Sequence, residues 1–274
     1  MTVFAKRKFI QLMALVAANP FAGNFLTGRI YRGASKSVCA PGLNCHSCPA
    51  AALACPVGAM QAVAAQPDRF FSAYAWGFVL LIGLILGRAV CGFLCPFGFF
   101  QELLHKIPSP KKELFAPLVY VKYLVLLLLV VIFPATLVDF AGFGRPAFCE
   151  YLCPAGTLTA GLPLILTRVE LRGVLGNLFA LKFAVLIAVF VGSVTVYRFF
   201  CKVLCPLGAI YALINRFSLY NLRLDEARCV KCGACRRACP MAVDPAQKLN
   251  LSECIRCGKC ARICPKGAIK LNLR

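Results

Sequence analysis

Four long apolar stretches dominate the pattern of hydrophobic and polar positions along this chain. They cover about residues 9–26, 74–90, 118–138 and 178–197. Each approaches the roughly 20 apolar residues that a helix needs to cross the hydrocarbon core of a bilayer. The first is the weakest, because Asn19-Pro20 interrupts it. The pattern predicts four transmembrane helices, followed by a more polar, cysteine-rich segment that begins near residue 222.

The composition supports a membrane protein. Hydrophobic residues make up 60% of the chain and charged residues only 15%, and the mean hydropathy is +0.77. These values lie outside the range of soluble globular domains. The basic run at residues 6–8 followed by an apolar stretch also resembles a signal peptide, but no convincing small-residue cleavage site follows, so a retained helix is favoured. We expect an all-α polytopic membrane domain at residues 1–221 and a small α+β domain at residues 222–274.

The C-terminal segment contains the same cysteine spacing twice. Each copy reads C-x2-C-x2-C-x3-C-P, which is the spacing of bacterial ferredoxins with two [4Fe–4S] clusters. In that arrangement the fourth cysteine of each run binds the cluster of the other run. Zinc or disulfides are the alternatives, but zinc needs only four ligands per site and no crossed cysteine. The predicted ligand sets are Cys229, Cys232, Cys235 and Cys264 for one cluster, and Cys254, Cys257, Cys260 and Cys239 for the other.

A second repeat follows the even-numbered apolar stretches. Residues 88–98 and 198–208 both read R-x2-C-x3-C-P-x-G, and their positions place both copies at one membrane face. We call their cysteines the inner set and predict that they share a third [4Fe–4S] cluster. Arg88 and Arg198 either compensate the negative charge of that cluster or extend to the lipid headgroups. The inner set consists of Cys91, Cys95, Cys201 and Cys205.

The sequence Cys-Pro-x-Gly also occurs at Cys55, Cys153 and Cys264. Proline is favoured at the first position of a helix, where its missing N–H costs nothing. A cluster bound by the preceding cysteine then lies at a helix N-terminus, where the free N–H groups and the helix dipole stabilise an anion. We therefore expect a helix to begin after each of these cysteines.

Six further cysteines form an outer set, which we expect on the opposite membrane face. Six is two more than one cluster uses, so either four of them bind a cluster or the loops form disulfides. A cluster is favoured because Cys-Pro-x-Gly occurs in both loops. We assign it to the four cysteines of the first loop, with the pair of the second loop close by; His46 is interpreted as a loop residue rather than a ligand. The set comprises Cys39, Cys45, Cys48 and Cys55, then Cys149 and Cys153.

With these motifs the chain resembles the NapH-type, NosR-like and CcoG-like membrane ferredoxin proteins. The resemblance rests on the four apolar stretches, the paired C-x3-C-P motifs of the inner set and the two-cluster domain at residues 229–264. It implies membrane electron transfer, with quinol oxidation proposed for the NapH members. The six outer cysteines depart from the NapH pattern and disfavour a simple quinol dehydrogenase.

Three functions remain open from the sequence. The chain is a transmembrane electron conduit, a quinol dehydrogenase subunit, or an oxidoreductase in which a leftover outer thiol pair reduces a disulfide. In the second case, Glu102 and His105 near the inner set are candidates for handling quinol protons.

Charge and thiol chemistry suggest partners and location. Residues 222–274 hold 12 Lys or Arg and 4 Asp or Glu, a formal charge of +8 that favours an acidic ferredoxin or flavodoxin, or anionic lipid headgroups. No nucleic-acid motif, dinucleotide fingerprint or haem-attachment sequence is present. Because cluster cysteines need a reducing compartment, we expect both termini in the cytoplasm of a prokaryote, a multi-pass chain in its cell membrane, and an extracytoplasmic acceptor or the quinone pool as the other redox partner.

Overall fold

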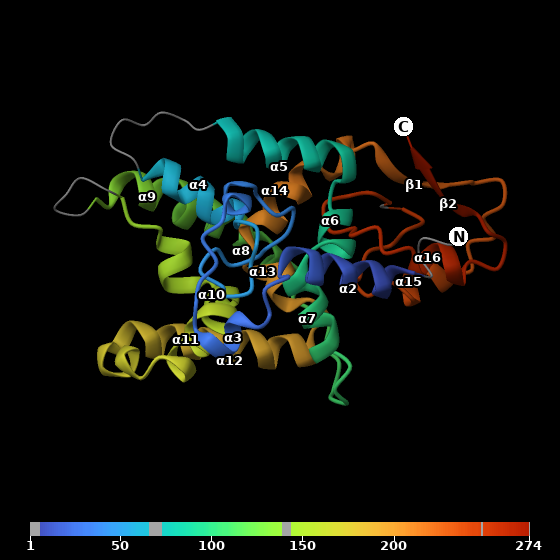
Figure 1. The fold of residues 1–274 in the computed structure, drawn as a ribbon. Helices are drawn as coiled ribbons and strands as arrows, with labels where there is room; N and C mark the ends of the chain where they lie inside the picture. The colour runs from blue at the N-terminus through green and yellow to red at the C-terminus, as the bar shows by residue number, and fades with distance from the viewer. Residues whose placement is uncertain (1–5, 66–72, 139–143, 248, 274) are drawn as a thin grey trace.

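The chain forms an elongated helical domain with a small cysteine-rich domain at one end (Figure 1). The computed structural model describes residues 6–65, 73–138, 144–247 and 249–273. The α-helices of the helical domain are α2 (Arg7–Ala18), α3 (Asn24–Thr27), α4 (Pro56–Ala64), α5 (Ala73–Leu86), α6 (Ala89–Phe93), α7 (Pro96–Leu104), α8 (Val121–Val125), α9 (Phe133–Thr136), α10 (Pro154–Gly156), α11 (Leu162–Thr167), α12 (Asn177–Thr195), α13 (Phe199–Val203) and α14 (Pro206–Ile214).

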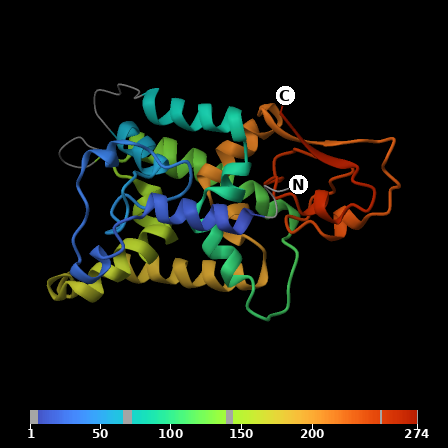
Figure 2. The same cartoon turned by 45° about the vertical axis from the view of Figure 1, so that its right-hand side comes forward.

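Shorter 3-10 and π-helical segments connect or extend these helices. The 3-10 segments are η1 (Ala34–Ser37), η2 (Ala116–Tyr120), η6 (Val169–Val174) and η7 (Asn215–Phe217), and the π segments are η3 (Leu126–Ile132), η4 (Phe148–Leu152) and η5 (Thr157–Gly161). Figures 1 and 2 both show α2, α5 and α12 running along the long axis of the molecule; α2 begins, and α5 and α12 end, on the side of the C-terminal domain.

Two of the four predicted spans have the length and composition of a membrane-crossing helix. They are Ala116–Thr136, with 21 residues, and Asn177–Thr195, with 19 residues, and they match the third and fourth apolar stretches. Leu127 and Val191, one on each helix, are exposed as lipid-facing side chains would be.

The other two stretches form shorter helices than expected. Helix α5 has 14 residues and α2 has 12, about 21 Å and 18 Å at 1.5 Å per residue, short of the roughly 30 Å hydrocarbon core. Helix α5 ends where Gly87 adopts a φ of +55° and turns the chain, and α2 ends before Asn19-Pro20, because proline disfavours a helical conformation in the residue before it. A count of four spans is therefore not confirmed for the described residues.

The second outer loop is more helical than its sequence suggested. Residues Phe148–Leu152 form a π-helical turn, and the short apolar helix Pro154–Thr167 follows it directly. This helix brings Cys149 and Cys153 against the bundle rather than leaving them in an extended loop.

The C-terminal domain combines two strands with two short helices. Strands β1 (Tyr220–Leu224) and β2 (Ile269–Leu273) pair antiparallel, with Leu222 opposite Leu271. Helices α15 (Ala234–Arg237) and α16 (Lys259–Ile263) each start after a glycine with φ near +70°. The first and last segments of the domain are thus joined, and the cysteine runs lie between them, which is the expected α+β ferredoxin-type arrangement.

Candidate iron–sulfur sites

The two cysteine runs of the C-terminal domain line two separate cavities. One cavity of about 550 Å³ is lined by the three cysteines that begin the first run and by Cys264 from the second. The other is lined by the three cysteines that begin the second run and by Cys239 from the first. The fourth cysteine of each run thus lines the cavity of the other run, and cluster binding by these two sets stays a prediction. The lining cysteines are Cys229, Cys232, Cys235 and Cys264, and Cys254, Cys257, Cys260 and Cys239.

Helices begin after four of the five Cys-Pro pairs of the Cys-Pro-x-Gly type. Each of these helices has its proline in the first turn and the cysteine as N-terminal cap. The expectation fails at Cys264, where a turn follows: Gly267 has a φ of +58° and the Ala268 N–H donates to Cys264 Sγ at 3.3 Å. The sulfur there still accepts a backbone hydrogen bond, but no helix dipole supports it.

The four cysteines of the inner set converge in the centre of the bundle. Backbone N–H groups of Gly98 and Gly208 donate to Cys95 Sγ at 3.4 Å and to Cys205 Sγ at 3.3 Å. Burial raises the pKa of Cys205, and the neighbouring thiols of Cys201, Cys91 and Cys95 raise it further. Four buried thiols beside two helix N-termini are the donor set that a cubane cluster needs.

A buried glutamine holds the inner set together. Gln101 on α7 is fully buried, and its side-chain amide donates to Cys201 Sγ at 3.1 Å. Its amide oxygen accepts the backbone N–H of Phe200 at 3.0 Å. One side chain from the first repeat therefore fixes a cysteine of the second.

Arg88 and Arg198 do not extend to lipid headgroups, because both side chains are completely buried. Arg88 donates to the carbonyl oxygen of Cys201 at 3.0 Å, and Arg198 donates to that of Cys91. Each arginine therefore binds the backbone of the opposite repeat. Arg88 Nε is a buried donor without a protein acceptor, which fits a site that binds an anionic cluster.

Glu102 is the counterion of this region. Its carboxylate accepts hydrogen bonds from Lys8 at 2.6 Å and from Arg198 at 2.6 Å, and it also pairs with Arg7. Burial alone raises the pKa of Glu102, but the charges of Arg198 and Arg7 outweigh it and hold the pKa well below its usual value. Glu102 is thus ionised at neutral pH and poorly suited to accept a quinol proton.

Four of the six outer cysteines also lie together. Burial raises the pKa of Cys153, and the thiols of Cys149, Cys45 and Cys55 raise it further. A methyl group built on Gly156 would lie 3.7 Å from Cys45 Sγ and 3.8 Å from Cys153 Sγ. The two outer loops therefore meet at their cysteines.

Cys39 and Cys48 have other surroundings. Cys39 forms a β-bridge with Ala54, and its N–H donates to the hydroxyl of Tyr74 at 3.3 Å. Cys48 packs with Ala50 and Ala51 in a second small cluster, against which Cys45 also packs. His46 is exposed, as expected for a loop residue.

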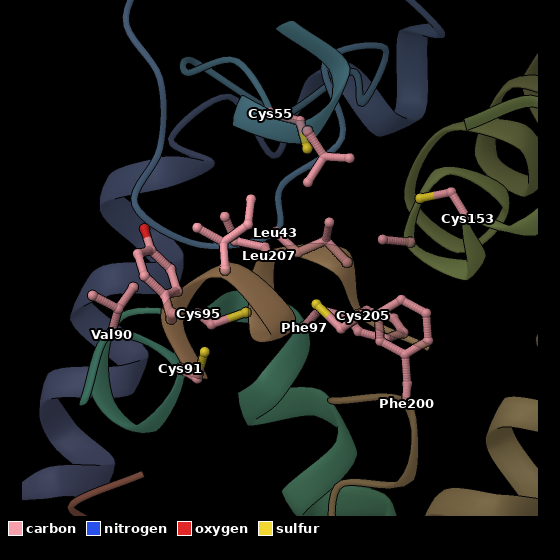
Figure 3. Close-up of a cluster of buried hydrophobic side chains, with 14 of the residues drawn as sticks. Leu43, Cys55, Val90, Cys91, Cys95, Phe97, Cys153, Phe200, Cys205 and Leu207 are labelled. Atoms are coloured by element: carbon pink, nitrogen blue, oxygen red, sulfur yellow. The ribbon is translucent and has the colours of Figure 1, made fainter. Parts of the chain in front are cut away.

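A short stretch of the first loop lies between the inner and outer sets. Leu43 is buried in the same hydrophobic cluster as Cys95 and Cys55. Gly42 makes this approach possible, because a Cβ there would lie only 2.7 Å from Cys95 Cα. Figure 3 shows Leu43 between Cys55 and Cys95 in one buried cluster.

The C-terminal domain is fixed against the inner set. A Cβ added to Gly92, next to Cys91, would lie 2.6 Å from the carbonyl oxygen of Ile255. The neighbouring Arg256 is fully buried and donates to the Leu86 carbonyl at 3.1 Å and to Ser218 Oγ at 2.5 Å. The cavity lined by Cys254 and Cys257 therefore lies directly against the inner set.

A basic cavity opens at the same junction. Its volume is about 490 Å³, and Cys239 lines it together with seven lysine and arginine side chains. Two carboxylates and His105 also line it. Burial and the charge of Lys111 lower the pKa of His105. The cations are Arg7, Lys8, Lys106, Lys111, Lys112, Lys202 and Lys259.

Among the described residues, no three His, Cys, Asp or Glu side chains approach closely enough to hold a single metal ion. A [4Fe–4S] cube stands between its four ligands, so its cysteines are spaced more widely than the ligands of one ion.

Comparison with protein families finds two matches. A family described as "4Fe-4S binding domain" matches residues 68–114, 123–168 and 178–224, which together are just over half of the chain. A family described as "4Fe-4S dicluster domain" matches residues 221–265. Each of the first three segments contains one C-x3-C-P pair: Cys91 and Cys95, Cys149 and Cys153, and Cys201 and Cys205.

Similar proteins include an uncharacterised protein, a putative electron transport protein and a regulatory protein. An uncharacterised protein of Methanocaldococcus jannaschii is 30% identical over 203 residues, which are 70% of this chain and 68% of that protein. The putative electron transport protein YccM of Escherichia coli is 25% identical, over 62% of this chain and 46% of YccM. The regulatory protein NosR of Pseudomonas aeruginosa is 31% identical, over 62% of this chain and 23% of NosR.

These matches confirm the resemblance to membrane-associated, ferredoxin-type electron-transfer proteins. The chain spans less than half the length of YccM and NosR. No solved structure matches it.

Proposed function

The chain belongs to the 4Fe-4S binding domain family, and on that premise we propose that it is a membrane-bound electron conduit. Electrons enter the C-terminal domain from a soluble cytoplasmic donor, pass to the inner set, and continue through the outer set to an acceptor on the extracytoplasmic side. The clusters supply one-electron redox centres when bound. The protein holds them in sequence.

The observation that carries this proposal is the unbroken row of cysteine sites. The second ferredoxin cavity adjoins the inner set through the contact of Ile255 with Gly92. The inner set adjoins the outer set through Gly42, which lies against Cys95, and through Leu43, which is buried in one cluster with Cys95 and Cys55 (Figure 3). A quinol dehydrogenase needs no outer set. A conduit needs redox sites through the whole depth of the membrane domain, because one transfer across the roughly 30 Å apolar core would be slow.

The protein's own groups favour negatively charged redox centres. Helix N-termini face the cysteines, amide N–H groups donate to their sulfurs, and the guanidinium groups of Arg88 and Arg198 approach the inner set from both repeats. These positive dipoles and charges stabilise the reduced, more negative form of each centre.

The membrane placement follows from the same geometry. Arg7, at the start of α2, pairs with Glu102 on α7, so α2 starts near the C-terminal domain (Figure 2). This supports a placement with both termini on one side, and the need for reduced thiols favours the cytoplasm. We propose that all four apolar stretches lie in the bilayer, with α2 and α5 crossing only part of it.

The basic cavity supports an acidic donor. Seven cations surround a cavity that Cys239 lines, so a ferredoxin or flavodoxin with an acidic surface would dock next to a cluster ligand. Electrostatic attraction would raise its association rate at low salt.

A quinol dehydrogenase remains the second candidate, because the same cavity contains His105 beside Cys239. The lowered pKa of His105 keeps its imidazole neutral at pH 7 and makes it a weaker base. The hypothesis of a disulfide-reducing oxidoreductase has less support. It requires a pair of thiols that binds no cluster, whereas Cys149 and Cys153 lie close to Cys45 and Cys55.

Electron transfer into liposomes tests the conduit. The full chain is reconstituted with its C-terminal domain outside and an impermeant acceptor inside, and a reduced flavodoxin is added outside. The double variant Cys201→Ser, Cys205→Ser should abolish reduction of the acceptor enclosed in the liposomes, while the EPR signals of the ferredoxin clusters persist. Ser193→Ala, which changes a fully buried side chain outside every cysteine set, is the control.

Transfer at the normal rate in the double variant would exclude the conduit. Reduction of the ferredoxin clusters by a quinol analogue in these liposomes, combined with that result, would favour the quinol dehydrogenase.

A further inference from the structure

We infer that the outer set binds a fourth [4Fe–4S] cluster through Cys45, Cys55, Cys149 and Cys153, in a site that duplicates the inner one. The inference rests on the proposed function only in taking the chain to carry clusters. It differs from an assignment to the first loop alone, because it takes two ligands from each loop and leaves Cys39 and Cys48 without a role in ligation.

The first argument is a duplicated glutamine. Gln61 on α4 is fully buried, and its side-chain amide donates to Cys149 Sγ at 3.1 Å. Its amide oxygen accepts the backbone N–H of Phe148 at 2.9 Å. Gln101 makes the same two contacts with Cys201 and Phe200, at 3.1 and 3.0 Å.

The spacing of these glutamines is also the same. Gln61 follows Cys55 by six residues, as Gln101 follows Cys95. In both places a Cys-Pro helix of one segment therefore binds a Phe-Cys pair of another through one side chain. Such a bidentate contact is the means by which the inner set is held together, and its repetition indicates the same kind of site.

The second argument is the shape of the backbone around Cys153. The N–H of Cys153 donates to the Phe148 carbonyl at 2.9 Å, and the N–H of Cys205 donates to the Phe200 carbonyl at 2.9 Å. The N–H of Gly156 donates to Cys153 Sγ at 3.4 Å, as that of Gly208 does to Cys205 at 3.3 Å.

The family comparison agrees with this duplication. The 4Fe-4S binding domain matches residues 123–168, which contain Cys149 and Cys153, as well as the two segments that contain the inner set. The outer pair in the second loop is thus recognised as the same motif as each inner pair.

The remaining ligand is Cys45, which takes the place of Cys91. It lies beside Gly156 and Cys153, and the residue before it, Asn44, is buried. On ligation each of the four cysteines loses its thiol proton to solvent as its sulfur bonds to iron, and the oxidation state of the cluster does not change.

Iron content in matched double variants tests the assignment. The full chain, purified anaerobically, should contain about 16 irons per chain with four clusters, and Cys149→Ser, Cys153→Ser should contain about 12. The variant Cys39→Ser, Cys48→Ser should keep the wild-type content. EPR of the ferredoxin clusters, unchanged in both variants, shows that the rest of the chain is folded.

Loss of about four irons from the Cys39, Cys48 variant, with none from the Cys149, Cys153 variant, would overturn the assignment in favour of the first loop. A wild-type plateau near 12 irons would overturn it in favour of free thiols or disulfides. If the Cys149, Cys153 variant loses its ferredoxin signals and so is misfolded, Cys45→Ser in the partly exposed first loop decides by the same count. The liposome test varies only Cys201 and Cys205, so a wrong choice of outer ligands leaves its result unchanged and can be told apart from a failure of the conduit.

Discussion

Replacing Gln101 by methionine should lower the reduction potential of the inner cluster. Methionine has a similar volume, but it cannot donate to Cys201 Sγ, which now receives a hydrogen bond of 3.1 Å. Such a bond is stronger to the reduced cluster, because its sulfurs carry more negative charge. Removing it therefore destabilises the reduced form more than the oxidised form.

The magnitude follows from the energy of that bond. A hydrogen bond to a charged group contributes roughly 1.5–3 kcal/mol, and we take about 1 kcal/mol as the difference between the two redox states. For a one-electron couple, 59 mV corresponds to a tenfold change in equilibrium constant, or about 1.4 kcal/mol, so the expected decrease is about 40 mV. The variant also leaves the buried Phe200 N–H without its acceptor, which should cost about 1–3 kcal/mol of stability.

An EPR-monitored redox titration of the anaerobic full-length protein measures this shift. Gln61→Met is the matched control, because Gln61 makes the same contact with Cys149: it should lower the potential of the outer cluster and leave the inner one unchanged. The reasoning would be refuted if the reduction potential of the inner cluster stays within about 10 mV of wild type in Gln101→Met. It would also be refuted if that potential changes in Gln61→Met.

Three further predictions concern charge and contact at the domain junction. Glu102→Gln removes the counterion of two buried arginines and should cost about 3–5 kcal/mol in thermal or chemical unfolding. The pKa of Glu102 is lower in the folded than in the unfolded protein. Glu102 therefore contributes fully to the free energy of unfolding above its unfolded pKa of about 4.3, and this contribution is lost as the pH falls through the lower folded pKa. A variant whose stability depends on acid pH as the wild type does would contradict this. Gly92→Val places a side chain against the Ile255 carbonyl and should slow transfer from the ferredoxin clusters to the inner cluster in freeze-quench EPR, with all signals retained; an unchanged rate would place the electron path elsewhere. Lys202→Glu with Lys259→Glu should slow reduction by an acidic flavodoxin roughly tenfold at low salt; a difference that persists at high salt would exclude an electrostatic cause.

The sequence predicted most reliably those parts of the sites that are encoded locally. The crossed cavities of Cys239 and Cys264 follow from spacing alone, because the ligands of each run lie within eleven consecutive residues. The proximity of Cys91 and Cys201 was predictable because the two copies of the repeat each directly follow an apolar stretch.

The outer site depends on contacts between distant segments and was therefore harder to predict. Whether Cys45 or Cys48 faces Cys153 depends on how Leu43 and Asn44 enter the core, and no periodicity of the first loop encodes that path. Gln61 does not stand out in the sequence, because a single glutamine resembles any polar residue. One signal was available: Gln61 follows Cys55 by six residues, as Gln101 follows Cys95.

Helix length was also difficult to read from hydropathy. The second apolar stretch continues past Leu86, but Gly87 adopts a positive φ and its neighbour Arg88 is buried within the protein. Apolar composition there reflects packing around cysteines rather than contact with lipid, and the two environments favour the same residues.

The attachment of Arg256 to the helical domain has a kinetic consequence. This side chain is fully buried and bonds to Leu86, Ser218 and Asn221, so the C-terminal domain does not dissociate between turnovers. On the proposed route, passage of an electron from that domain to the inner set is then a first-order step, whose rate is independent of protein concentration and nearly insensitive to ionic strength. A free ferredoxin must find its acceptor by collision each time, whereas this chain confines diffusion to the first encounter with its donor.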